Sequence, residues 1–172
     1  NIKEKSLEAR KQIGVISHDT YLYESLTAYE NLIFYGRMYG VQNLESKIET
    51  LLEQVGLKAR RNDRVATYSR GMKQRLSIAR AVLHNPEILL LDEPYTGLDQ
   101  QASRTFEKIL AELYGSEKEK TTVMTTHDLE RGLQMCNRAI ILNNGKIVYD
   151  AARSEIPKLE QFRERYEALI GG

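Results

Sequence analysis

Four consecutive apolar residues, Ile88-Leu-Leu-Leu91, run directly into two carboxylates, Asp92 and Glu93. The helical pattern before them is broken at Pro86, so we expect the run to be a strand. A run without polar residues predicts a strand buried on both faces of a parallel sheet. In open α/β sheets ligands bind at the carboxyl ends of the strands. The segment therefore predicts an α/β fold with a site at Asp92 and Glu93, and the alternative is a strand that meets a solvated turn.

Strands and helices alternate on both sides of this run, and the middle of the chain is helical. Thr27 and Glu30 have the spacing of a capping box, which predicts a helix start. The sequence Asn143-Asn-Gly145 between two apolar runs predicts a hairpin turn. Predicted strands cover 12–17, 88–91, 121–126, 138–142 and 146–149. Predicted helices cover 27–39, 43–56, 69–83, 99–114 and 153–170, with a short helix that begins at Asp128. This order predicts an α/β architecture with a helical insertion.

Composition excludes several classes of protein. The chain has 172 residues, about one domain, with 25 basic and 24 acidic residues and a net charge of +1. This balance argues against a dedicated nucleic-acid binder. The single cysteine, Cys136, rules out an intrachain disulfide. The apolar runs are far shorter than the roughly 20 residues of a membrane-spanning helix, so we expect no bilayer span.

Three further segments carry groups suited to phosphate chemistry. Ser69-Arg-Gly-Met72 opens a helix, whose exposed N–H groups suit an anion, although simple capping is the alternative. Asp99 follows Thr96-Gly-Leu98 and is either a helix cap or part of a site. His127 lies at the end of a second strand, 121–126, which we expect to be buried and to end where a ligand would lie, although most single histidines are structural.

Together, in this order, the segments resemble the ATP-binding cassette (ABC) ATPases. The resemblance spans about residues 13–149. The matching segments are 68–72 for the signature motif, 89–93 for Walker B, 96–99 for the D-loop, His127 for the switch histidine, and His18-Asp19 at the place of the Q-loop. It implies a P-loop NTPase (RecA-like) parallel sheet, incomplete here, with an inserted helical subdomain. The implied segments are 1–24 (core), 25–84 (helical subdomain), 85–150 (core) and 151–172 (C-terminal helix).

The resemblance also implies ATP and Mg²⁺ as cofactors and assigns roles to residues. Glu93 would orient the attacking water and His127 would reach the γ-phosphate, as the catalytic pair. Asp92 would support Mg²⁺, and His18 and Asp19 are further candidates for the ion. The nucleotide-binding positions would be Ser69, Arg70, Gly71, Met72, Asp99 and His127, with the signature residues contacting the γ-phosphate held by a second subunit.

One family motif has no match within the 172 residues. The P-loop reads Gly-x-x-x-x-Gly-Lys-[Ser/Thr], but Gly145-Lys146, the one Gly-Lys pair, is followed by Ile147. We therefore expect a sheet with a gap, weak ATP binding by the isolated chain, and an N-terminal part elsewhere in a longer ATPase. The alternative is a degenerate cassette that acts as a non-hydrolysing regulatory module.

Partners and location follow from the same resemblance. It implies a transport motor on the cytoplasmic face of the membrane, a separate membrane subunit, and a second ATP-binding subunit arranged head to tail, without nucleic acid. A soluble ATPase acting on DNA or ribosomes is disfavoured by the neutral charge. Three segments, 69–75, 92–101 and 126–131, resemble those of haem-exporter (cytochrome c maturation) ATPases and related ABC-2 exporters. Tyr21 and Tyr23 would line the groove for the membrane subunit, whereas we expect Phe34 and Tyr35 in the core.

Overall fold

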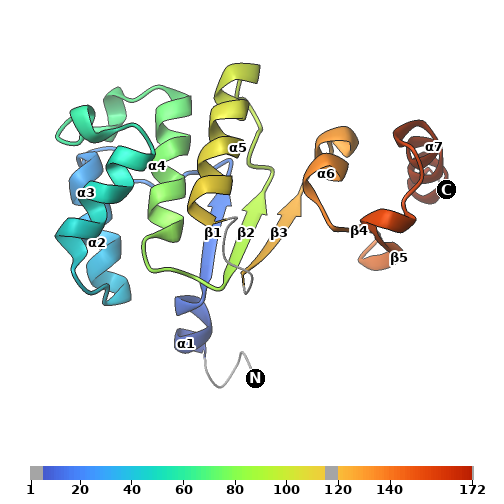
Figure 1. Cartoon of the computed structure of the whole chain (residues 1–172), viewed down its shortest axis with the longest axis horizontal. Helices are drawn as coiled ribbons and strands as arrows, with labels where there is room; N and C mark the ends of the chain where they lie inside the picture. The colour runs from blue at the N-terminus through green and yellow to red at the C-terminus, as the bar shows by residue number, and fades with distance from the viewer. Residues whose placement is uncertain (1–5, 115–119, 172) are drawn as a thin grey trace. The chain divides into compact units, whose positions relative to one another are not determined.

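A computed structural model describes residues 6–114 and 120–171. The chain divides into two compact units, residues 1–125 and residues 126–172 (Figure 1). Each unit is described by itself below. The predicted segment boundaries after residues 24, 84 and 150 stay predictions.

The first unit is built on a three-stranded parallel sheet in the order β1-β2-β3. The strands are β1 (Ile13–Ser17), β2 (Ile88–Asp92) and β3 (Thr121–Thr125). Ser17 pairs with Asp92, and Asp92 pairs with Thr125. The register therefore places the last residues of all three strands in one row, with adjacent strands about 4.8 Å apart.

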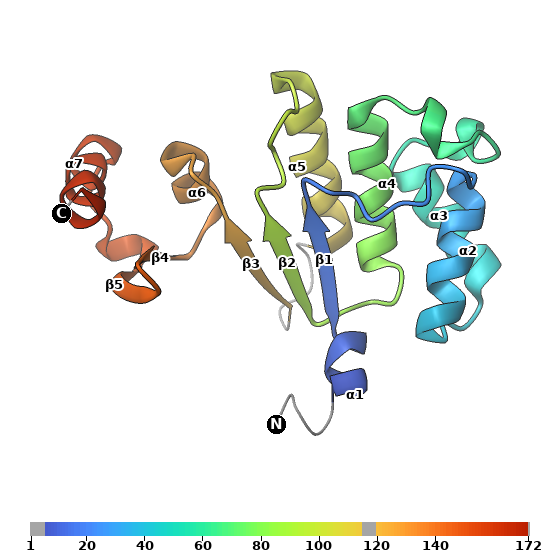
Figure 2. The same cartoon turned by 180° about the vertical axis from the view of Figure 1, so that it is seen from behind.

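Two helices, α4 (Arg70–Val82) and α5 (Gln100–Tyr114), lie on one face of this sheet (Figure 2). Leu89 and Leu91 are buried, whereas Leu90 is half-buried. The prediction of a strand buried on both faces is therefore wrong for the described part of the unit, and so is the predicted burial of β3, which is exposed at four of its five residues. The physical reason is that alternate side chains of β2 point to opposite faces, and no helix among residues 6–114 covers the second face.

The predicted helical insertion is present. Helix α2 (Ala28–Tyr39) begins at the predicted capping box and ends at Gly40, whose φ of 70° suits a left-handed C-cap. Helix α3 (Leu44–Gln54) follows it. The two helices contribute fully buried side chains, among them Leu32, Ile48 and Leu52, to the same apolar core as β1 and β2.

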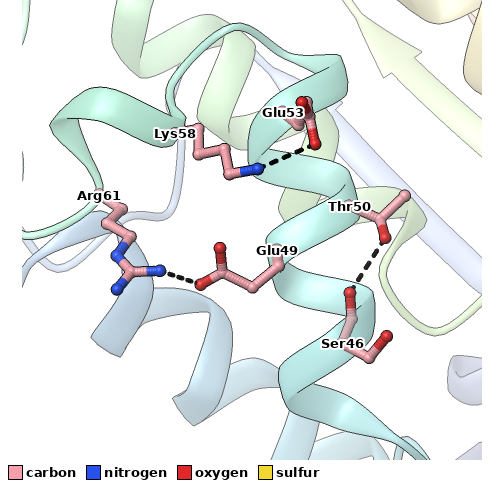
Figure 3. Close-up of polar contacts among 6 residues, drawn as sticks. All are labelled: Ser46, Glu49, Thr50, Glu53, Lys58 and Arg61. Carbon is pink, nitrogen blue, oxygen red and sulfur yellow. Dashed lines mark hydrogen bonds and ion pairs between the residues drawn. The ribbon is translucent and has the colours of Figure 1, made fainter.

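The segment after α3 looks like a polar linker in the sequence, but it folds against α3. It contains two short 3₁₀ helices, Lys58–Arg60 and Val65–Thr67, and the Val65 side chain is fully buried. Figure 3 shows the polar contacts on this side of α3: Lys58 Nζ to Glu53 at 3.1 Å, Arg61 to Glu49, and the Thr50 hydroxyl donating to the Ser46 carbonyl at 3.0 Å.

The second unit contains α6 (Leu129–Met135), an antiparallel hairpin and α7 (Leu159–Ile170). The hairpin strands are β4 (Arg138–Asn143) and β5 (Lys146–Ala152), and the predicted turn between them has positive φ at Asn144 and Gly145. A small core joins these elements through Leu133, Ile141, Ile156 and Phe162.

Two helices differ from the prediction at the ends of the chain. Helix α7 begins at Leu159, six residues after the predicted start. Pro157 accounts for the difference, because proline lacks an N–H and keeps the residue before it out of the helical region. Helix α1 (Ser6–Lys11) is absent from the prediction. It has six residues, too few for an apolar period to be recognised.

Within the described ranges, no helix has the length and apolarity to cross a bilayer.

Candidate functional site

The row of strand ends forms what we call the strand-end site, made of Ser17, His18, Asp19, Asp92, Glu93 and Thr125. The Thr125 hydroxyl donates a hydrogen bond to Asp92 Oδ1 at 2.6 Å. The backbone N–H of Glu93 donates to two oxygens of Thr125, the carbonyl and the hydroxyl, each at 3.2 Å. The two predicted carboxylates therefore lie together at the carboxyl end of β2, tied to the adjacent strand.

Glu93 has an unusual backbone conformation. Its φ is 45°, in the left-handed region that non-glycine residues rarely adopt. The chain turns sharply there, so Glu93 leaves the line of β2 directly after Asp92. Non-glycine residues held in this region cluster at functional sites.

The two residues predicted at the Q-loop follow β1 beside Asp92. His18 Nε2 lies 3.6 Å from Asp19 Oδ2, and both side chains are exposed, at 54% and 76%. The Asp19 N–H donates to the Ser17 hydroxyl at 3.1 Å. In the described residues no group of three or more His, Cys, Asp or Glu is arranged to hold a metal ion.

A second cluster, which we call the signature hollow, lies at the start of α4. Its lining includes all five predicted nucleotide-binding residues of the first unit: Ser69, Arg70, Gly71, Met72 and Asp99. The Ser69 hydroxyl accepts from the Met72 N–H at 3.3 Å, as a helix N-cap. Capping occupies an acceptor position of the hydroxyl and leaves its O–H as a donor. The Arg70 and Gly71 N–H groups have no intrahelical partner in the first turn of a helix, so this end suits an anion.

Two side chains of α4 bind the loop that follows Glu93. Arg70 Nη2 donates to the Thr96 carbonyl at 2.7 Å, and its guanidinium lies against Gly97, where a Cβ would clash with it. The buried Gln74 amide donates to the Pro94 carbonyl at 3.0 Å. The signature hollow and the strand-end site are therefore connected through one loop, residues 93–99.

Asp99 and His127 occupy helix starts. The Asp99 carboxylate accepts from the Ala102 N–H at 2.7 Å, as the predicted cap of α5. His127 is exposed and belongs to the second unit, where the Thr126 hydroxyl accepts from the Asp128 N–H at 3.0 Å. The approach of His127 to the strand-end site stays a prediction.

A third feature is the aromatic surface, which we define as Tyr21, Tyr23 and Phe34. Their side chains are 43–55% exposed. The Tyr23 and Phe34 rings meet edge to face at 5.0 Å. The prediction that Phe34 packs in the core is wrong, because its position on α2 faces solvent beside Tyr23. Tyr35 is half-buried and packs against the core.

Buried polar side chains hold this surface in place. Asn31 is fully buried and makes three hydrogen bonds: from the Tyr23 N–H at 2.8 Å, and to the carbonyls of Tyr23 and Thr27 at 3.0 and 2.9 Å. The Arg80 guanidinium lies 5.5 and 5.3 Å from the Tyr21 and Tyr35 ring centroids.

Two features near this surface carry shifted pKa values. Burial raises the pKa of the Tyr35 hydroxyl. His84 stacks on Tyr39 with centroids 4.0 Å apart, and its Nε2 lies 3.2 Å from the Ile13 carbonyl. Burial, with the nearby charges of Arg80 and Lys47, lowers the pKa of the His84 imidazole against the opposing effect of the Ile13 carbonyl.

Three residues that shape these sites are not predicted from the sequence: Thr125, Gln74 and Arg80. The two α4 residues had a recognisable signal, because Gln74, Ser77 and Arg80 recur every three positions and all are buried. Polar residues spaced along one helix face share that face. Thr125 carried only the weak signal of a hydroxyl residue at a strand end.

Comparison with known proteins gives a consistent result. The family model described as "ABC transporter" matches residues 1–96. The chain is 35% identical to the ABC transporter ATP-binding protein NatA of Bacillus subtilis, over 90% of this chain and 63% of that protein. It is 34% identical to the linearmycin resistance ATP-binding protein LnrL of the same organism, over 90% and 50%. A Nod factor export ATP-binding protein I, of Rhizobium johnstonii, is 39% identical over 80% and 44%.

A solved structure supports the fold. The "Structure of ATP binding subunit of ABC transporter" superposes with a TM-score of 0.82 at 28% identity, covering 98% of this chain and 72% of that chain. The chain spans 44–63% of the three relatives above. The narrower resemblance to haem-exporter ATPases stays a prediction.

Proposed function

We propose that this chain, which belongs to the ABC transporter family, forms part of an ATP-hydrolysing subunit. This subunit would drive transport through a separate membrane subunit. The observation that carries the proposal is the strand-end site. Two adjacent carboxylates, Asp92 and Glu93, lie at the carboxyl end of a parallel strand, where α/β folds bind ligands. A module that only binds partners has no need for both acids there.

The residues of the strand-end site fit a magnesium ion. Mg²⁺ is usually bound through one or two carboxylates together with substrate phosphates, and not by a cage of protein ligands alone. The Thr125 hydroxyl donates a hydrogen bond to Oδ1 of Asp92. The second oxygen of the carboxylate can then bind a cation. Asp92 would hold the ion, with His18 or Asp19 nearby in the segment that follows β1. When bound, Mg²⁺ would neutralise charge on the phosphates.

The protein's own groups would then position the reactants. Glu93 would accept a hydrogen bond from the attacking water and orient it, and His127 would donate to the γ-phosphate. The Ser69 hydroxyl and the Gly71 N–H would bind the γ-phosphate of a second subunit from the start of α4. Asp99 would link the two sites. Phosphoryl transfer depends mostly on such positioning and charge stabilisation.

A direct test measures phosphate release by the complete protein, assembled with its membrane subunit, at saturating ATP. We expect Mg²⁺-dependent hydrolysis that Glu93→Gln abolishes. Glu87→Gln is the matched control, because Glu87 is exposed at the opposite end of β2. Equal rates for wild type and Glu93→Gln would contradict the proposal and favour a non-hydrolysing regulatory module.

We propose that the aromatic surface binds the membrane subunit on the cytoplasmic face of the membrane. Exposed aromatic side chains are favoured as interface anchors, and Asn31 and Arg80 hold this surface rigid from below. We expect Tyr23→Ala to keep the fold and lose assembly with the membrane subunit. Co-purification with the tagged membrane subunit measures this, and Leu142→Ala, at an exposed apolar residue of the second unit, is the control. Unchanged assembly of Tyr23→Ala would exclude the surface.

The direction of transport that we propose is export. Two of the relatives carry names that refer to linearmycin resistance and to Nod factor export. The cargo is selected by the membrane subunit, so the strand-end site does not distinguish haem from other cargoes. Transport of radiolabelled candidates into inverted vesicles tests the direction, and ATP-dependent loss from the vesicle lumen would contradict export.

A further inference from the structure

One hydroxyl group at the end of β3 contacts both acidic residues of the strand-end site. The Thr125 hydroxyl donates a hydrogen bond to Asp92 Oδ1 at 2.6 Å and accepts one from the Glu93 N–H at 3.2 Å. A threonine hydroxyl has one donor and two acceptor positions, so both bonds can exist at once. The same N–H of Glu93 also reaches the Thr125 carbonyl at 3.2 Å.

These bonds act on two different properties of the acids. The bond to Oδ1 fixes the rotation of the Asp92 carboxylate, which determines where its other oxygen points. The bonds to the Glu93 N–H hold a backbone whose φ of 45° lies in a region that side chains disfavour. A conformation of this kind persists only when its surroundings hold it.

The sheet register explains why this position can do both. Thr125 pairs directly with Asp92, so its side chain starts from the neighbouring strand at the same height. Glu93 is the next residue, where the chain turns. Thr121 and Thr122 lie on the same strand but pair with Ile88 and Leu89, far from the acids.

We propose that Thr125 is a positioning residue for ATP hydrolysis, which aims the Asp92 carboxylate at the metal ion and holds Glu93 in its turn. The inference rests on the proposed function of the strand-end site. Thr125 does not touch the reacting atoms. Its effect passes through Asp92 and Glu93.

The test compares three variants of the complete, assembled protein. Thr125→Val removes the hydroxyl and keeps a β-branched shape, Thr125→Ser keeps the hydroxyl, and Thr122→Val makes the same change elsewhere on β3. Loss of a group that orients a metal ligand typically costs about 10- to 100-fold in activity or metal affinity. We expect Thr125→Val to lower kcat by about that factor, with the KM for ATP unchanged within about twofold. Thr125→Ser and Thr122→Val should stay near wild type.

A second measurement does not depend on hydrolysis. Amide hydrogen exchange of Glu93, followed by NMR without nucleotide, reports its hydrogen bonds directly. We expect faster exchange in Thr125→Val than in wild type, and no change in Thr125→Ser. Equal exchange in all variants would overturn the positioning role, as would wild-type kcat in Thr125→Val. A wild-type protein that hydrolyses no ATP would instead refute the proposed function, and the exchange rates would still decide whether Thr125 holds Glu93.

Discussion

Gly71 offers a way to separate the stability of the fold from the function of the signature hollow. It is the second residue of α4, in the helical part of the chain, and its φ is not positive. A Cβ built on Gly71 would meet the Ala102 Cβ at 3.5 Å, which is ordinary van der Waals contact. The first unit therefore has room for Gly71→Ala.

The size of the effect follows from these two facts. Alanine is favoured over glycine in a helix by about 0.5–1 kcal/mol, and the added methyl makes only an ordinary van der Waals contact with Ala102. We expect Gly71→Ala to leave the free energy of unfolding unchanged or raise it by up to about 1 kcal/mol. The melting temperature would rise by at most about 2–4 °C for a chain of this size.

The expected effect on ATP hydrolysis is opposite to the expected effect on stability. If the start of α4 binds the γ-phosphate of a second subunit, a methyl beside the Gly71 N–H obstructs that approach. We expect ATP hydrolysis by the assembled protein to fall, although the variant is at least as stable as wild type. Urea unfolding and phosphate release measure the two quantities on the same preparation. A loss of stability above about 1 kcal/mol would refute the packing argument, and normal hydrolysis would refute the role of the helix start.

Three further substitutions test other parts of the structure. Asn31→Ala removes three hydrogen bonds of a fully buried amide, each with a net value of about 0.5–1.5 kcal/mol, so urea unfolding should show a loss of about 2–4 kcal/mol; a loss below that of one hydrogen bond would contradict the network. The Arg70 side chain binds the Thr96 carbonyl, so Arg70→Gly should speed amide exchange in residues 96–99. Equal exchange in the variant and in wild type would show that this bond does not order the loop. Because the folded pKa of His84 lies below its unfolded value of 6.5, the stability from neutral His84 is complete above that pH and is lost as the pH falls through the folded pKa. The stability of wild type should therefore fall more steeply than that of His84→Gln between pH 7.5 and 5.5, and parallel curves would contradict the shift.

Local signals predicted most of the secondary structure. The capping box at Thr27, the Ser69 cap and the Asn-Gly turn all occur where the sequence places them. Each depends on side-chain to backbone bonds within a few residues, so a short stretch of sequence contains the whole cause.

Features that depend on distant partners were harder to predict. Leu90 looks like its neighbours in sequence, but its burial depends on what covers the second face of the sheet. Phe34 is apolar, which predicts a place in the core, but its position on α2 brings it to the surface beside Tyr23. The composition of a segment does not contain this information, because it resides in the packing of other elements.

The sequence predicts the acidic residues of the strand-end site, but not the residues that position them. Asp92 and Glu93 follow from an apolar strand that ends in two carboxylates. Thr125 lies 32 positions after Glu93, and only the register between β2 and β3 brings it to them. Arg70 was expected to add charge near the phosphates, whereas its guanidinium contacts the Thr96 carbonyl and Gly97. Its approach to a phosphate stays a prediction.

We propose that Glu93 acts in the hydrolysis of ATP and not in its binding. A single-turnover experiment on the assembled protein tests this by counting ATP bound and ADP formed in the same sample. We expect Glu93→Gln to bind as much ATP as wild type and to convert almost none of it to ADP. Conversion of the bound ATP at the wild-type rate would contradict the claim.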